Sequence, residues 1–581
     1  MKFNIIAPDN LCVNIEEREE NSVKYFDVMI NAEEEVEFEQ VKIEWYQPSI
    51  DMHAFWHCGA GKNKNLRVDW EYGIDSKSTV NAPVGTFLNV IGRNRYSVAY
   101  SDCIETVNLN LGVHEETAEI KCVLTLFREK SKKRKSYKET IRMDFRDIPY
   151  YEAIKDMSKW YETIGKYEAL KVPEEARKPM YSTWYNYHQN LQDTVIEKQC
   201  GIAKRLGMDT IIVDDGWQTE DNNRWYGYTG DWEIAESRFP NMKDHVKRVH
   251  DMGMKYMIWY SVPYMGKYAK VWDEFKGKLL YYHEEHMAGV LDLRYPEVRE
   301  YLLGKYVEMV KENDIDGLKL DFVDQFDMRY AQGHALEEDC NRDFESIQEA
   351  VDCFLQTVVT ELKKIKEDIM IEFRQRYIGP AMRKHGNMFR VMDCPNDILT
   401  NRVGTIDLRL FSGNTAVHAD VLMWNVEDHV ESAALFLINT LFSVPQYSMK
   451  LDEISEEHFK MSKFYLEFMD KHRDVLLDGE LVPYNPELLY PKVESFTEDK
   501  KVIAFYGDIV VNTGKVPREL FIVNGALKED FVLDIEDEIK GNMKVYDCMG
   551  NVVRDESVEW HKGLMKISIP KSGIIKIFQD K

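Results

Sequence analysis

The sequence lacks several features that would place it in a class at once. Its 581 residues contain no apolar run of about 18, the length that a membrane-spanning helix needs, so no membrane partner is expected. The opening MKFNIIAPDN has neither an apolar core nor a small-residue cleavage site, so we expect no signal peptide. The nine cysteines form no CxxC pair, and an odd number cannot all pair with one another, which favours reduced thiols in a cytoplasmic protein.

Positive charge is also in short supply. Lysine and arginine total 75 against 101 acidic residues, which gives a net charge of −26 and argues against nucleic acid as a partner. His57, His188, His334 and His418 form no HxH or HxxxH pair near a predicted strand end, so we expect no metal and no other cofactor. Aromatic residues, in contrast, are plentiful: 12 tryptophans and 32 tyrosines offer flat apolar faces that suit sugar rings.

The hydrophobic pattern divides the chain into four segments. Residues 1–150 and 479–581 alternate polar and apolar positions, which predicts an N-terminal β-sandwich and a small C-terminal β-domain. Residues 151–178 have helical spacing and are predicted to form a linker. In residues 179–478, short apolar runs alternate with longer amphipathic stretches, as in repeated βα units with a parallel sheet. We therefore predict an α/β protein in which a (β/α)₈ TIM barrel is flanked by the two β-domains.

Eight predicted strands in residues 179–478 match the number that closes such a barrel. They are residues 180–185, 210–215, 256–261, 289–293, 317–322, 369–374, 389–393 and 416–420. In a (β/α)₈ barrel the loops that follow the strands meet at one end, where active sites lie. At or just after that end the sequence places Trp184, Tyr185, Asp214, Asp215, Trp259, Asp292, Lys319, Asp321, Arg374, Arg376, Asp393 and Asp420. A set of helix N-caps would also include Ser, Thr and Asn, so the concentration of acids indicates a functional cleft.

The run GLKLDFVDQF, residues 317–326, places a lysine and an aspartate in a strand that is otherwise apolar. Lys319 and Asp321 are two residues apart and therefore lie on the same face of the strand. A buried charge is costly unless it is paired or used, so the strand carries either an ion pair or a catalytic group. Two carboxylates in one cleft, surrounded by aromatic rings and cationic donors, are what glycoside hydrolysis requires.

Two other functions fit parts of this pattern. A metal-dependent barrel enzyme, of the enolase-like or amidohydrolase-like kind, also gathers acids at strand ends, but we find no such ligand spacing in the sequence. A noncatalytic sugar-binding protein would not need a pair of carboxylates, and Asp321 and Asp393 provide one.

Three motifs of the sequence resemble those of a known family. VDDGWQ at 213–218, GDWEIAESRFPNMKDHVKRVHDMGMKYMIWY at 230–260 and LKLDF at 318–322 resemble the α-galactosidases of glycoside hydrolase family 36 in clan D. The resemblance covers residues 180–425 and agrees with the predicted domain order. It implies a retaining enzyme that removes a terminal α-linked galactose by double displacement. Two alternative activities on the same scaffold are those of an α-N-acetylgalactosaminidase and an α-galactosyl transferase. The oligomeric state is also open, and a homo-oligomer is one alternative.

The resemblance also implies roles for individual residues. Asp321 matches the family's nucleophile, and Asp393 matches its acid/base, with Asp397 as the alternative. We expect Asp393 to be protonated at neutral pH because of partial burial and the negative charge of Asp321. The residues that the resemblance assigns to sugar binding are Asp214, Asp215, Lys319, Trp184, Tyr185 and Trp259. Trp56, in the predicted sandwich, is expected to reach over the barrel.

One segment departs from the family. Where many members have a cysteine and a glycine-rich run, this chain has FRQRYIGP, which contains Arg374 and Arg376. Because the resemblance places this region at the sugar subsite, we include both arginines among the candidate binding residues. The identity of the sugar stays open.

Overall fold

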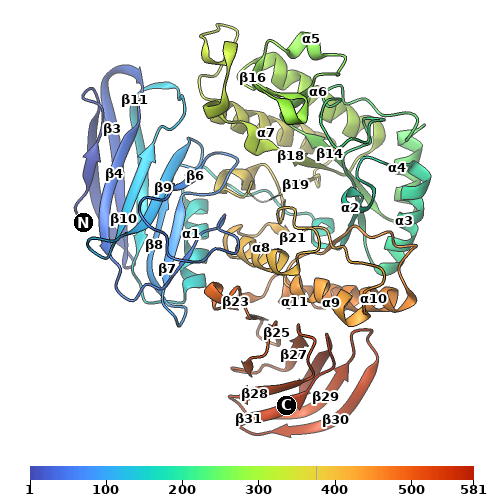
Figure 1. Ribbon diagram of the computed structural model, residues 1–581. Coiled ribbons are helices and arrows are strands. Elements are labelled where there is room, and N and C mark those ends of the chain that lie inside the picture. The colour runs from blue at the N-terminus through green and yellow to red at the C-terminus, as the bar shows by residue number, and fades with distance from the viewer. Residues whose placement is uncertain (375, 581) are drawn as a thin grey trace.

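The computed structural model describes residues 1–374 and 376–580. Its N-terminal part consists of two antiparallel sheets (Figure 1), with the strand orders β1-β4-β10-β9-β6 and β2-β3-β11-β8-β7-β5. The strands are β1 (Asn4–Ile6), β2 (Cys12–Glu20), β3 (Val23–Glu37), β4 (Val41–Pro48), β5 (Ala54–Trp56), β6 (Ile74–Ser76), β7 (Val84–Leu88), β8 (Asn94–Tyr100), β9 (Val107–His114), β10 (Glu119–Leu126) and β11 (Lys133–Asp144). In the first half of β3 every second residue, Phe26, Val28 and Ile30, enters the core between the sheets, which confirms the period-two prediction for this part of the strand.

The middle of the chain forms a parallel barrel with the strand order β21-β20-β19-β18-β14-β13-β12-β22. Its strands are β12 (Met180–Ser182), β13 (Thr210–Val213), β14 (Lys255–Ser261), β18 (Gly317–Asp321), β19 (Met370–Arg374), β20 (Met388–Arg390), β21 (Ala416–His418) and β22 (Gln446–Tyr447). A parallel bridge between His418 and Val444 joins the two ends of this order, so the barrel is nearly closed. All four residues of β13 are buried, as expected for a strand that is covered on both faces. The predicted barrel fold is confirmed.

One predicted barrel strand is wrong. Residues 289–293 contribute to β17 (Ala288–Leu291), which lies in a separate antiparallel sheet with β15 (Tyr264–Gly266) and β16 (Leu279–His283). Strand β18 instead pairs directly with β14. The eighth barrel strand is β22, whose two residues are too few to show any hydrophobic period.

The longer helices lie around the outside of the barrel (Figure 1). In chain order the helices are α1 (Tyr150–Thr163), α2 (Trp184–Tyr187), α3 (Asp193–Leu206), α4 (Met242–Asp251), α5 (Trp272–Phe275), α6 (Pro296–Asn313), α7 (Ile347–Ile365), α8 (Ile398–Phe411), α9 (Val430–Asn439), α10 (Glu456–Lys471) and α11 (Arg473–Leu476). Local sequence determines where several helices begin and end. At the start of α4 the Asn241 side chain accepts a hydrogen bond from the backbone amide of Asp244, and α3 ends at Gly207, which has the left-handed conformation. No helix of the described chain combines the length and the apolar character that crossing a membrane requires.

The C-terminal part contains a seven-stranded sheet with the order β23-β24-β25-β27-β32-β29-β30 and a three-stranded sheet with the order β26-β28-β31. Its strands are β23 (Glu480–Tyr484), β24 (Lys492–Phe496), β25 (Lys500–Phe505), β26 (Val510–Asn512), β27 (Glu519–Asn524), β28 (Asp530–Ile535), β29 (Ile539–Tyr546), β30 (Val552–Trp560), β31 (Gly563–Ser568) and β32 (Ile574–Gln579). This β-domain lies below the barrel in Figure 1. The loops that follow the carboxyl ends of the barrel strands carry the predicted acids.

Candidate active site

The Asp321 carboxylate ends β18 and is held from several sides. Trp259, on the neighbouring strand β14, donates from Nε1 to Oδ2 at 3.2 Å, and Arg374 at the end of β19 donates from Nε to Oδ1 at 2.8 Å. The amide of Phe322 also donates to Oδ1 at 2.8 Å. Burial raises the pKa of Asp321, but the charges of Arg374 and Lys319 outweigh it and hold that pKa below its ordinary value. Asp321 is therefore an ionised carboxylate.

The buried charge of Lys319 is compensated by an ion pair. Its Nζ lies 2.6 Å from Oδ2 of Asp214, which follows β13, and both side chains are buried. Asp215 is buried beside this pair and accepts hydrogen bonds from Gln189 at 2.9 Å and Gln218 at 2.6 Å. Burial raises the pKa of Asp215 to about 7. The structure therefore brings the ion pair and a second carboxyl group to the same strand ends as Asp321.

Asp393, the predicted acid, lies in the loop after β20 with 42% of its side chain exposed. Arg390, at the end of that strand, donates from Nη2 to Oδ1 at 2.7 Å. Burial raises the pKa of Asp393, but the charges of Arg390, Lys319 and Arg374 outweigh it and hold the pKa at about 2. The expectation of a protonated Asp393 is wrong for this structure, because it considered Asp321 and burial but not Arg390.

The alternative acid, Asp397, already has a structural role. It is the N-cap of α8 and accepts the Thr400 amide at 2.9 Å. Its second oxygen accepts a hydrogen bond at 2.8 Å from Lys62, in the connection between β5 and β6. The position of Asp397 is thus explained without catalysis, which favours Asp393 as the acid/base.

Two residues of the site received no role from the sequence. Arg390 donates through Nη1 to Asp420, which follows β21, while its Nη2 holds Asp393. Asp420 also accepts the Tyr185 hydroxyl at 2.7 Å and the Cys394 amide at 2.6 Å. A charged side chain inside a buried strand is the signal that singled out Lys319, and it could have singled out Arg390 as well.

The remaining predicted residues lie in different places. Trp184 is partly buried in the short helix α2, and its ring packs edge-on against His188 with centroids 4.7 Å apart. Arg376 is exposed, and its carbonyl accepts the Asn81 amide at 2.9 Å. Asp292 forms ion pairs with Arg294 and Arg342 beyond the small sheet and does not join the Asp321 cluster.

Trp56 does not reach over the barrel opening, so that expectation is wrong. Its side chain is fully buried, and Nε1 donates to Oδ1 of Asp407 on α8 at 2.8 Å. The ring also packs near Phe411 at the end of the same helix, with centroids 6.2 Å apart. Trp56 therefore belongs to the interface between the N-terminal sheets and an outer helix of the barrel.

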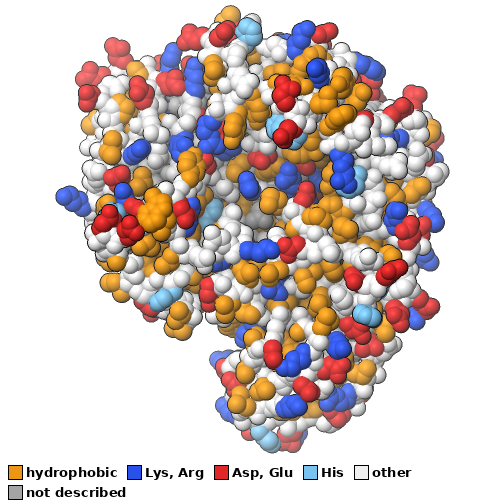
Figure 2. Space-filling view, viewed as in Figure 1, with side chains coloured by type: hydrophobic (Ala, Val, Ile, Leu, Met, Phe, Trp, Pro, Cys, Tyr) orange, Lys and Arg blue, Asp and Glu red, His pale blue; other side chains and the backbone are white. Residues whose placement is uncertain are grey.

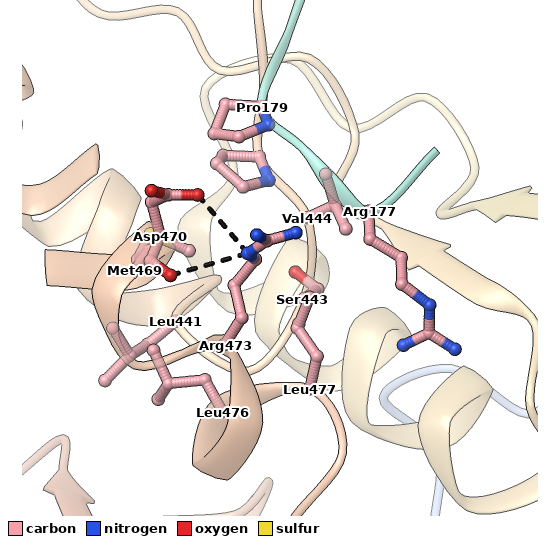
Figure 3. A pocket seen from close by; sticks show the side chains of 11 residues that line it. Arg177, Pro179, Leu441, Ser443, Val444, Met469, Asp470, Arg473, Leu476 and Leu477 are labelled. Carbon is pink, nitrogen blue, oxygen red and sulfur yellow. Dashed lines mark hydrogen bonds and ion pairs between the residues drawn. The ribbon is translucent and has the colours of Figure 1, made fainter. Parts of the chain in front are cut away.

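The face seen in Figure 2 shows basic and acidic side chains gathered over the middle of the barrel, beside the N-terminal sheets. A small cavity shown in Figure 3 lies elsewhere: its walls include Pro179, just before β12, and Val444, just before β22. These residues mark the amino ends of the strands, opposite Asp321. The cavity leaves about 10 Å³ of internal space, about what one water fills, so it cannot hold a sugar.

Parallel strands that carry carboxylates, a lysine and an indole at their carboxyl ends define the class, a (β/α)₈-barrel protein with the side chains of a glycosidase site. Within that class, residues 148–372 match the family model described as Melibiase.

The curated relatives agree with this family. An α-galactosidase of Escherichia coli is 24% identical over 205 residues, which cover 33% of this chain and 28% of that protein. Alpha-galactosidase 1 of Pediococcus pentosaceus is 25% identical over 149 residues, 24% of this chain and 19% of that protein. The matched part thus spans less than a third of either relative's own length.

Solved structures resemble almost the whole chain. The α-galactosidase of Lactobacillus brevis covers 100% of this chain and 85% of its own, with a TM-score of 0.67 and 11% identity. The family 36 α-galactosidase AgaA of Geobacillus stearothermophilus covers 98% of this chain and 81% of its own, with a TM-score of 0.69 and 13% identity. At such low identity these likenesses establish the shared three-part fold.

Proposed function

We propose that this protein is a retaining α-galactosidase, which removes a terminal α-linked galactose from oligosaccharides or glycosides. The observation that carries the proposal is the Asp321 carboxylate, kept ionised at the end of β18 between Trp259 and Arg374. It lies within the segment that matches the Melibiase family, and the curated relatives of that segment are α-galactosidases. An ionised, buried carboxylate is the nucleophile that a retaining mechanism requires.

In this proposal Asp321 attacks the anomeric carbon, and Asp393 gives a proton to the leaving oxygen. Because Arg390 holds Asp393 ionised, substrate entry has to separate the two before Asp393 can carry a proton. Arg390 keeps Asp420 as its second partner, so its charge stays compensated when Asp393 turns away. In the second step Asp393 takes a proton from water, which then releases the sugar from Asp321.

The sugar would be held mainly by side chains that the barrel strands fix in place. Lys319, Asp214 and Asp215 offer a donor and acceptors for hydroxyl groups, and the faces of Trp184 and Trp259 offer apolar contact. We also place Tyr185, Arg374 and Arg376 at this subsite. Solved structures of AgaA variants contain stachyose or raffinose, which supports an oligosaccharide as the substrate of this chain.

We further propose a cytoplasmic location. Cys12, Cys340 and Cys353 are exposed thiols, and such thiols persist in reducing compartments.

The test is a panel of aryl α-glycosides of galactose, N-acetylgalactosamine, glucose and xylose, assayed with wild type and with Asp321→Ala. Release of the aryl group from the galactoside, lost by several orders of magnitude in the variant, would support the proposal. Asp397→Ala is the matched control, because it removes a nearby carboxylate that caps α8. Release from the N-acetylgalactosaminide alone would replace galactose as the substrate, and β-galactose as the first product by NMR would overturn retention. No release from any glycoside would overturn the hydrolase.

A further inference from the structure

Residues 77–81, in the connection between β6 and β7 of the N-terminal sheets, contact the barrel loop that follows Asp321. The Lys77 ammonium donates to the carbonyls of Asp324 at 3.1 Å and Phe326 at 2.8 Å, and to Oδ2 of Asp327 at 3.2 Å. Side chains Lys77 and Asp327 are each only 5% exposed. An ammonium has three N–H donors, and this one has three acceptors in the loop that starts two residues after Asp321.

The rest of the 77–81 segment reaches the same loop and the next one. Thr79 is fully buried and donates from Oγ1 to the carbonyl of Val323 at 3.0 Å. The Asn81 amide donates to the carbonyl of Arg376, in the loop after β19. A side chain at Gly379 would collide with the Asn81 carbonyl, because a Cβ there would lie 2.6 Å from that oxygen. The N-terminal sheets thus contact the loops after both β18 and β19.

These loops in turn contact the Asp321 carboxylate. The Tyr377 hydroxyl donates to Oδ1 of Asp324 at 2.8 Å and lies 3.5 Å from Oδ1 of Asp321. Between Asp321 and the loop, Phe322 has a φ of 64°, in the left-handed region. A bulky residue adopts that conformation only where its surroundings impose it, so the path of the chain after Asp321 depends on what holds residues 323–327.

We propose that Lys77 is a positioning residue for the Asp321 nucleophile, acting through the loop at residues 323–327. The N-terminal sheets then serve catalysis by fixing the direction of the carboxylate. This inference rests on the proposed function for its kinetic consequence, while its structural consequence can be measured without substrate. Removing the ammonium takes a donor from the carbonyls of Asp324 and Phe326. The Phe326 carbonyl keeps the Gln348 side chain as a donor at 3.0 Å, so the loop has to shift mainly to satisfy the Asp324 carbonyl.

The test compares Lys77→Met with Lys64→Met. Lys64, in the connection between β5 and β6, is also buried and pairs with a barrel carboxylate, Oδ2 of Asp407 on α8, at 2.6 Å. Each variant breaks one buried ion pair between the two parts of the protein, and each leaves the aspartate with other donors. Of these two lysines, Lys77 contacts the loop at residues 323–327 and Lys64 contacts Asp407 on α8, so Lys64→Met controls for a general loss of stability.

Two measurements distinguish the variants. We expect Lys77→Met to lower kcat on an aryl α-galactoside about tenfold or more, because misplacing a reacting group by about 1 Å can cost about 100-fold. KM should change far less, because Lys319 and Asp214 still bind the sugar. Hydrogen exchange of the amides in residues 322–331 should become faster in Lys77→Met but not in Lys64→Met. If Lys77→Met does not fold, Thr79→Val removes the neighbouring donor with little change of shape and should show the same pattern more weakly.

An equal loss of kcat in both lysine variants would overturn the inference, because it would show a general effect of loosening the interface. Unchanged exchange in residues 322–331 would also overturn it. If the wild type hydrolyses no glycoside, the proposed function fails, and the exchange comparison alone decides whether Lys77 fixes the loop.

Discussion

Replacing Arg374 by methionine should move the acid limb of the pH profile of kcat/KM upward by about one to three pH units, the range by which a neighbouring cation shifts a carboxyl pKa. The Arg374 guanidinium is the charge that most strongly opposes the effect of burial on Asp321, and it approaches Oδ1 to 2.8 Å. Without it, burial raises the pKa of Asp321, and the protonated fraction of the nucleophile grows at low pH. Below the raised pKa, kcat/KM should fall about tenfold for each pH unit.

Methionine is the right replacement because Arg374 also packs. Its guanidinium carbon lies 5.4 Å from the ring centre of Phe322 and 5.1 Å from that of Tyr377, and an unbranched apolar chain keeps much of that contact. The assay is kcat/KM for an aryl α-galactoside from acid to mildly alkaline pH. Lys62→Met is the control, since it also removes one positive charge near the opening, but from a residue that pairs with Asp397. An acid limb at the wild-type pH in Arg374→Met would refute the reasoning.

Three further predictions follow from the site and its surroundings. Asp393→Asn should slow the release of poor leaving groups by about 10²–10⁴-fold while sparing the first, pre-steady-state release of nitrophenol, whereas Asp397→Ala should lose about 0.5–2 kcal/mol of stability with its kcat retained. If leaving-group kinetics changed in Asp397→Ala and thermal unfolding changed in Asp393→Asn, Asp397 would be the acid/base and Asp393 the structural residue. Trp56→Phe should lose about 1–3 kcal/mol of unfolding free energy by leaving Asp407 without one donor, and a raised KM would contradict the interface position. Asp215 stays protonated in the folded state up to a pKa of about 7, so the folded protein binds more protons than the unfolded one between about pH 4 and 7. The unfolding free energy should therefore fall by up to about 1.4 kcal/mol per pH unit across this window, and denaturation of Asp215→Asn should lack that slope; equal slopes would reject the assignment.

Much of the fold could be predicted from local pattern. Seven of the eight predicted barrel strands exist, because a parallel strand buried on both faces is a short apolar run whatever its neighbours are. The same property explains the error at residues 289–293, since an apolar run does not reveal which sheet it joins. Strand β22 is defined only by its partners, β12 and the bridge at Val444, and such long-range pairing leaves no mark on two residues.

The site was predictable to the same degree. A charge inside an apolar strand revealed Lys319 and Asp321, and the structure places both at the strand ends with Asp214. The ionisation of Asp393 was not predictable, because it depends on the direction of the Arg390 side chain and on the charges of two other strands. Trp56 shows the same limit: an aromatic residue can face a ligand or an interface, and only its neighbours decide.

Phe322 faces two demands that no single residue satisfies fully. Its backbone, with a φ of 64°, would favour glycine, whereas its ring packs against Tyr226 and Tyr264, with centroids 4.9 and 5.1 Å away. Residue 322 is a phenylalanine, so the packing of its ring has to offset the unfavourable backbone conformation beside the nucleophile. A glycine there would relax the turn and remove the ring together. The aromatic cluster around Phe322 therefore helps to fix the position of Asp321. Redesign of that cluster for a different sugar would also make the nucleophile more mobile.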